Sequence, residues 1–420
     1  MDIQICNYED RVNNCDRSER IPECTEAGAV EGECREVETQ DKDPTVQAEA
    51  EEDLLPECDK EKCVLPACFC STDGTLAPGV APEEGGLTIN EVPQMILISF
   101  NGAVTGQNMA MYERLFKSNR VNPNGCSVKG TFFVSHKYTN YSAVTELHRK
   151  GHEIGVFSVS NNDQEEYWQK GDYDTWLLEM AGNRQILETF ANIKDQSVVG
   201  VRAPYLKVGG DTQFKMMNDT YFPYDASITV PLSRVPVWPY TLDYRIPHTC
   251  HGNCPKESWP LWEMPINELD RREDPTFDEE LTGCPLVSSC TNIQDTDQFK
   301  TLLQNNFNRH YSTNRAPLSL SFTPFWLYSN KGFIEVFENW MDSVLARYKD
   351  VFFVTNYQAL LWITNPTNVN NIGVFEEWKD KCKVKNTPLD VYFDHLTDGP
   401  SQFVVLVSFY DVAVIVCAAG

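Results

Sequence analysis

Two groups of side chains in this sequence have the residue types and spacing of metal ligands. His148 and His152 are separated by three residues, which can place two imidazoles on one face of a helix. Gly151 lies between them and a strand-like run begins at Glu153, so we expect the pair to span a helix end and favour buried, hydrogen-bonded histidines. The segment His248-x-Cys250-His251-x2-Cys254 also has metal-like spacing. Because the chain is rich in cysteine, we favour a local disulfide there.

Apolar runs alternate with helix-like segments through most of the chain. Strand-like runs lie at 95–100, 130–135, 153–157, 198–203, 226–230, 261–266, 318–322 and 351–355. Helix-like segments lie at 108–117, 141–149, 175–189, 296–311, 333–348 and 357–363. This alternation predicts an α/β fold with a parallel sheet, and seven or eight units in roughly 290 residues fit a distorted (β/α)7–8 barrel.

In a barrel of parallel strands, the chemistry lies at the carboxyl ends of the strands. Those ends offer one arginine, Arg202, together with amides, hydroxyls and aromatic rings, and no Gly-x-Ser-x-Gly nucleophile motif occurs. We interpret Asn101-Gly102 as a tight turn. The predicted opening could hold a ligand but is poorly equipped for proton transfer.

Four long segments make the chain similar to a known family: 132–144 (FFVSHKYTNYSAV), 147–154 (LHRKGHEI), 199–206 (VGVRAPYL) and 267–275 (NELDRREDP). From Cys58 to about Cys382 the sequence resembles the insect chitin deacetylases of the polysaccharide deacetylase (NodB-like, carbohydrate esterase 4) family. The resemblance implies a distorted, disulfide-stapled (β/α)7–8 barrel. It also implies removal of acetyl groups from N-acetylglucosamine polymers with one divalent metal, usually zinc.

The chain departs from the family at the reacting positions. Active members carry Thr-Phe-Asp-Asp where this sequence has Ser99-Phe-Asn-Gly102. The resemblance places the general base at Asn101, the three metal ligands at Gly102, Phe157 and Asn161, and the general acid at Thr323. Arg202 and Asp225 are retained.

These replacements remove the groups on which the family reaction depends. A catalytic zinc needs about three protein ligands, and without the metal the pKa of water stays near 15.7 instead of falling to about 7. An amide cannot accept a proton at neutral pH. We therefore expect no metal, no cofactor and no catalysis.

If catalysis is excluded, binding is the function that we expect. We expect the chain to bind chitin, N-acetylglucosamine oligomers or an extracellular-matrix protein. A weakly active deacetylase with other ligands and a protein-interaction module without glycan binding are the alternatives. Aromatic rings that could stack on sugars are Tyr205, Trp238 and Trp326. Core packing is the alternative, equally supported for Trp238 and favoured for Trp326.

Charge and cysteine content indicate the environment of the protein. Asp and Glu total 61 against 35 Lys and Arg, a net charge of −26, which argues against nucleic acid and anionic membranes as general partners. Fifteen cysteines and the glycosylation sequons at Asn140 and Asn218 favour an extracellular protein, although no signal peptide follows Met1.

Composition divides the chain into three parts. We predict an acidic, cysteine-containing leader and linker over 1–57, largely disordered, a barrel domain over 58–382, and a tail over 383–420 that is apolar from 403. The apolar run is barely long enough to span a bilayer and contains Asp411, so membrane attachment is disfavoured. A removed anchor signal and an unstructured tail are the two interpretations of this segment.

Overall fold

The structure is a computed structural model that describes residues 5–6, 55–273, 283–379, 382, 403–409 and 412–418. The chain divides into a body, Asp53–Asp390, and a small second unit, Met1–Glu52 with Val391–Gly420. Most of the predicted leader and part of the predicted tail lie outside the described residues. In the apolar run of the tail, the structure has two strands, β13 (Phe403–Phe409) and β14 (Val412–Ala418). They pair antiparallel with each other, and β1 (Ile5–Cys6) pairs with β14.

A mostly parallel sheet forms the centre of the body. Seven strands run parallel in the order β11-β2-β3-β4-β5-β6-β9, β12 pairs with β2, and β8 adds antiparallel to β9. A separate parallel pair joins β7 to β10. The strands are β2 (Gln94–Gly102), β3 (Thr131–Ser135), β4 (Glu153–Ser158), β5 (Gly200–Val201), β6 (Tyr224–Asp225), β7 (Thr229–Val230), β8 (Tyr240–Thr241), β9 (Trp262–Glu263), β10 (Ile266–Asn267), β11 (Leu318–Phe322) and β12 (Val351–Val354).

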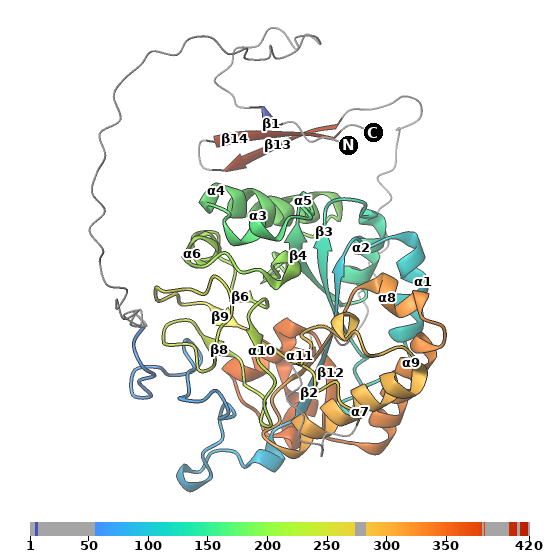
Figure 1. The fold of residues 1–420 in the computed structure, drawn as a ribbon. Helices are drawn as coiled ribbons and strands as arrows, with labels where there is room; N and C mark the ends of the chain where they lie inside the picture. The colour runs from blue at the N-terminus through green and yellow to red at the C-terminus, as the bar shows by residue number, and fades with distance from the viewer. Residues whose placement is uncertain are drawn as a thin grey trace, which may run out of the picture. The chain divides into compact units, whose positions relative to one another are not determined.

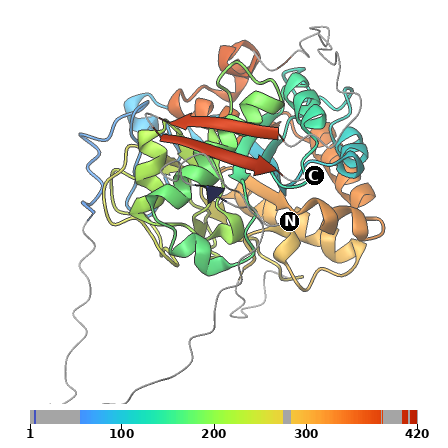
Figure 2. The same cartoon turned by 90° about the horizontal axis from the view of Figure 1, so that it is seen from above.

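Helices cover the outside of this sheet. They are α1 (Gly106–Leu115), α2 (Tyr141–Arg149), α3 (Glu165–Gln169), α4 (Tyr173–Trp176), α5 (Gly182–Phe190), α6 (Asp211–Asp219), α7 (Thr296–Ser312), α8 (Pro324–Ser329), α9 (Phe333–Arg347), α10 (Asn356–Thr364) and α11 (Glu376–Lys379). A π-helical turn, Leu177–Ala181, joins α4 to α5. Figure 1 shows α1, α2, α7 and α9 flanking the strands, and Figure 2 gives the same arrangement from above. The predicted α/β fold, a distorted barrel of parallel strands, is confirmed.

Both faces of strand β2 are buried, as is usual for a strand in a parallel sheet, so the strand lies inside the core. Side chains on its two faces pack into two different clusters. Met95 and Leu97 join a cluster rich in tryptophan, while Phe100 stacks on Phe132 and Phe322 with ring centroids 5.5 and 5.7 Å apart. The strand therefore fixes the position of its own carboxyl end, residues 101 and 102.

Disulfides staple the body. The ten cysteines from Cys58 to Cys382 form five bonds: Cys58–Cys70, Cys63–Cys68, Cys126–Cys382, Cys250–Cys254 and Cys284–Cys290. The local disulfide expected between Cys250 and Cys254 is confirmed. No helix in the described ranges has both the length and the apolar character needed to cross a bilayer.

Candidate functional site

A pocket of about 530 Å³ lies where the carboxyl ends of β2, β4, β5 and β11 meet. All five positions at which the family resemblance places reacting groups line it: Asn101, Gly102, Phe157, Asn161 and Thr323. The structure thus brings together residues up to 222 positions apart, from Asn101 to Thr323, at one opening. The remaining lining residues are Ala103, Thr105, Gln107, Asn108, Tyr138, Ala203, Pro204, Tyr205, Leu206, Leu286, Pro324, Phe325 and Tyr328. Among the described residues that line this pocket, none carries a charged side chain.

Arg202 lies beneath the pocket and is completely buried. Its guanidinium lies 4.1 Å from the centre of the Phe133 ring, and burial lowers the pKa of Arg202 to about 10. It donates to four oxygens, all of them uncharged: Ser99 Oγ (2.8 Å), Asn101 Oδ1 (3.1 Å), Ser321 Oγ (3.0 Å) and the carbonyl of Ala226 (2.9 Å). The Nη2 atom is buried without a hydrogen-bond partner among the described residues. The arginine is therefore joined to the pocket through the side chain of Asn101.

Asp225 lies deeper in the body and does not line the pocket. Its carboxylate accepts from the backbone and hydroxyl of Ser227 (2.7 and 2.9 Å) and from Gln213 Nε2 (2.9 Å). It also pairs in register with Glu263 on the neighbouring strand β9. Burial raises the pKa of Asp225 to about 6, and burial with the neighbouring carboxyl raises the pKa of Glu263 well above its ordinary value. The pair therefore holds a proton at mildly acidic pH. Asp225 is linked to the pocket through Ser227, whose Oγ accepts from the backbone N–H of the lining residue Ala203 at 2.8 Å.

The three positions where the resemblance places metal ligands do not fit a zinc ion. Gly102 has no side chain and Phe157 has no donor atom, so Asn161 contributes one neutral amide where zinc needs about three ligands. Glu179 holds the loop that bears Asn161, because its carboxylate accepts from the backbone N–H groups of Val159 and Ser160 at 2.9 and 3.0 Å. Within the described part of the chain, no group of three or more His, Cys, Asp or Glu side chains could hold an ion.

Thr323 is the N-cap of α8 and is exposed. Its backbone N–H donates to Ser288 Oγ at 3.2 Å, and Ser288 Oγ in turn donates to Thr323 Oγ1 at 3.3 Å. A threonine hydroxyl with a pKa far above neutrality cannot replace an imidazole as a proton donor. The side chain at this position can offer a hydrogen bond to a ligand and no more.

The backbone around the pocket is strained. Of the eight non-glycine residues with positive φ in the chain's described part, four line this one pocket: Tyr138 (70°), Asn161 (48°), Tyr205 (56°) and Leu206 (57°). Gly102, with φ of 104°, also lines it. Such conformations cost of order 1–3 kcal/mol each and cluster at functional sites. The sequence gives no sign of this strain.

Aromatic rings stand at the mouth of the pocket. Tyr138, Tyr205 and Phe325 line it with 77, 50 and 64% of their surface exposed. Sequence reasoning singled out Tyr205 and missed Tyr138. Tyr138 follows β3 just as Asn101 and Phe157 end β2 and β4, so the strand-end rule, applied to every strand, would have found it.

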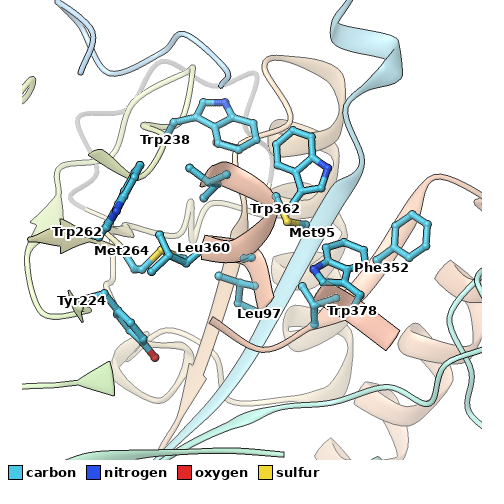
Figure 3. Packing of buried hydrophobic residues seen from close by; sticks show 14 of the residues in the cluster. Met95, Leu97, Tyr224, Trp238, Trp262, Met264, Phe352, Leu360, Trp362 and Trp378 are labelled. Carbon is cyan, nitrogen blue, oxygen red and sulfur yellow. The ribbon is translucent and has the colours of Figure 1, made fainter. Parts of the chain in front are cut away.

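The other two tryptophan candidates do not line the pocket. Trp238 is fully buried in the core, where its indole N–H donates to the carbonyl of Asn314 at 3.0 Å and its ring lies 6.0 Å from that of Trp362 (Figure 3). Its placement as a substrate-binding residue is therefore corrected to a core residue. Trp326 is half-buried and packs against Phe299 and Phe333, with ring centroids 5.4 and 5.0 Å away. This packing agrees with the core interpretation that the sequence favours for Trp326.

The histidine pair is engaged in structural hydrogen bonds. His152 is buried, and its Nδ1 accepts from the Gly130 backbone N–H at 3.1 Å. His148 Nε2 lies 2.9 Å from Ser197 Oγ and 3.3 Å from a carboxylate oxygen of Asp195. Neither histidine lines the pocket at the strand ends.

Comparisons with known proteins show which proteins this chain resembles. No family model matches the chain. Chitin deacetylase 1 of Bombyx mori is 53% identical over 336 residues, which cover 79% of this chain and 61% of that protein, so the match spans less than two thirds of the relative's length. Chitin deacetylase 8 of Bombyx mori is 32% identical over 324 residues, which cover 76% of this chain and 80% of that protein.

Among solved structures, a putative polysaccharide deacetylase from Mycobacterium smegmatis matches with a TM-score of 0.43 and 17% identity, covering 69% of this chain and 93% of that one. Puue allantoinase matches with a TM-score of 0.45 and 13% identity, covering 65% and 92%. The sequence relatives decide the assignment, since one of them is matched over four fifths of its length at more than 30% identity. The chain belongs to the chitin deacetylase family of polysaccharide deacetylases.

Proposed function

We propose that this chain is a catalytically inactive member of its family that binds chitin or N-acetylglucosamine oligomers outside the cell. The observation that carries the proposal is the pocket at the strand ends. It holds all five positions where the family's reacting groups are expected, and its described lining has no charged side chain. Water bound there without a metal would keep a pKa near 15.7, so hydrolysis of an amide would have no nucleophile at neutral pH.

The strained backbone around the pocket supports a binding role. Four non-glycine residues in positive-φ conformations around one pocket cost stability, and such cost persists where it serves a function. The exposed faces of Tyr138, Tyr205 and Phe325 are suited to stack on sugar rings, which are apolar on their faces and polar at their edges. Five disulfides favour an oxidising compartment, consistent with an extracellular polymer as ligand.

A matched pair of variants tests glycan binding. Tyr205→Ala should weaken binding of an N-acetylglucosamine oligomer by about tenfold, the loss expected for one stacked ring. Tyr221→Ala is the control, because Tyr221 is exposed and has nearly the same backbone conformation, φ 59° against 56°, but does not line the pocket. Titration calorimetry measures both. Equal losses, or an absence of oligomer binding by the parent chain, would refute glycan binding in this pocket and favour a protein-interaction module.

Two further measurements test inactivity. Zinc content by mass spectrometry and acetate release from chitin oligomers should both be at background, and Asn101→Asp alone should not change either, since the metal positions would still lack donors. Gly102→Asp, Phe157→His and Asn161→His together should recover metal uptake, with Asn101→Asp and Thr323→His also needed for turnover. Stoichiometric zinc with turnover in the parent chain would overturn the proposal.

A further inference from the structure

We propose that the pocket distinguishes the acetylation state of an amino sugar, binding N-acetylated units and rejecting units with a free amine, because Asn101 presents an N–H donor at its floor. This inference rests on the proposed glycan-binding function and adds a specificity to it. It concerns Asn101, through which the pocket is joined to the buried Arg202.

Arg202 fixes which end of the Asn101 amide faces the ligand. A guanidinium has only donors, so the atom 3.1 Å from Arg202 Nη1 must be the amide oxygen. The amide nitrogen then points away from the arginine, and it has no hydrogen-bond partner among the described residues. Asn101 is partly exposed and lines the pocket. Where the family resemblance places a carboxylate acceptor, this chain therefore offers a donor.

An acetyl group and an ammonium group meet this donor differently. The acetyl carbonyl is an acceptor and complements an amide N–H, whereas an ammonium has three donors and no acceptor. An ammonium would also enter a pocket whose described lining has no carboxylate to pair with it, and an unpaired charge is costly to remove from water. Below that floor the fully buried Arg202 adds a like charge.

The rest of the lining suits an acetamide. Asn161 lines the same pocket, and its side-chain amide has no hydrogen-bond partner within the described residues, so it can both donate and accept. The space beside Gly102 is open, since a β-carbon built there would meet no atom within 4 Å. An N-acetyl group can therefore hydrogen-bond to the amides of Asn101 and Asn161 and has space beside Gly102. A charged amine meets no carboxylate in the described lining, and Asn101 offers it a donor instead of an acceptor.

The test compares two oligomers of equal length, one fully N-acetylated and one fully deacetylated. Titration calorimetry is done at mildly acidic pH, where the free amine is charged. The buffer contains about 0.5 M salt, which screens the general attraction between the acidic protein surface and the cationic oligomer. We expect the acetylated oligomer to bind at least about tenfold more tightly. Raising the pH until the amine is neutral should narrow this ratio.

Asn101→Asp should reduce the ratio several-fold, because the floor then offers acceptors and a negative charge. Asn370→Asp adds the same charge at an exposed position of the 3-10 helix Val369–Val374, which does not line the pocket. This control should leave the ratio of the two affinities unchanged. If Asn101→Asp does not fold, Asn101→Ser removes the amide donor without adding charge and should also lower the ratio.

The outcomes separate the inference from the function on which it rests. Equal binding of the two oligomers, or a ratio that Asn101 variants leave unchanged, would refute the inference while glycan binding stands. Binding of neither oligomer would instead refute the proposed function.

Discussion

Placing at Gly102 the aspartate that the family resemblance implies there should destabilise the protein, even though there is room for the side chain. Gly102 has φ of 104°, a conformation that side-chain-bearing residues rarely adopt, and no atom lies within 4 Å of a β-carbon built there. The cost is therefore backbone strain without steric clash, of order 1–3 kcal/mol. A β-carbon also restricts the unfolded chain, which returns about 0.4–1 kcal/mol. We expect Gly102→Asp to lower the free energy of unfolding by about 1–2 kcal/mol.

Two alanine variants isolate the backbone contribution, measured by denaturant unfolding monitored through tryptophan fluorescence. Gly102→Ala should lose nearly as much stability as Gly102→Asp, because the strain arises at the β-carbon. Gly106→Ala is the matched control: a built β-carbon there also meets nothing within 4 Å, φ is not positive, and the position begins α1. That variant should be neutral or stabilising. If Gly102→Ala is as stable as Gly106→Ala, the backbone at the end of β2 is not strained and the reasoning is wrong.

Two further predictions concern the interior. Trp238→Ala should destabilise the body by about 3–5 kcal/mol in denaturant unfolding, because it empties a fully buried core position, and a loss below about 1 kcal/mol would show that the ring is not core. Stability should also fall as pH rises from about 4 through 6. Burial raises the pKa of Asp225 from 3.8 to about 6 beside Glu263 and Arg202, so the folded state binds this proton more tightly than the unfolded chain does. The difference is about 3 kcal/mol, and Asp225→Asn should flatten this part of the measured stability–pH curve; an unchanged slope would contradict the assignment.

Elements with a strong local signal are well predicted from the sequence. The helix predicted at 141–149 matches α2 at both ends, because Asn140 caps it by accepting from the Ala143 backbone N–H. The strand predicted at 318–322 matches β11, whose five residues are all buried. Local patterns succeed in these places because cap chemistry and burial coincide with the element boundaries.

Where tertiary packing decides the structure, the sequence is less informative. The strand predicted at 198–203 shrinks to two residues, Gly200–Val201, and α6 and α8 are missed. The predicted run 226–230 covers β7, while β6 ends just before it, at Asp225. These short strands depend on pairing across the sheet and carry little periodicity of their own.

The same division holds for the candidate site. The strand-end rule and the family resemblance locate Asn101, Phe157 and Thr323, since each follows or ends a strong strand. The burial of Trp238 could not be predicted, because its neighbour Trp362 comes from α10. The left-handed backbone conformation of Tyr205 could not be predicted from the sequence either, since tyrosine has no preference for that conformation.

The bond between Cys126 and Cys382 ties together positions 256 residues apart, from the segment before β3 to the segment after α11. A protease that cuts any surface loop between them would leave two pieces still joined by sulfur. Nicked molecules would migrate at full size on a gel until a reductant is added. In an environment rich in digestive or remodelling proteases, the body could thus carry a broken peptide bond and keep its pocket assembled.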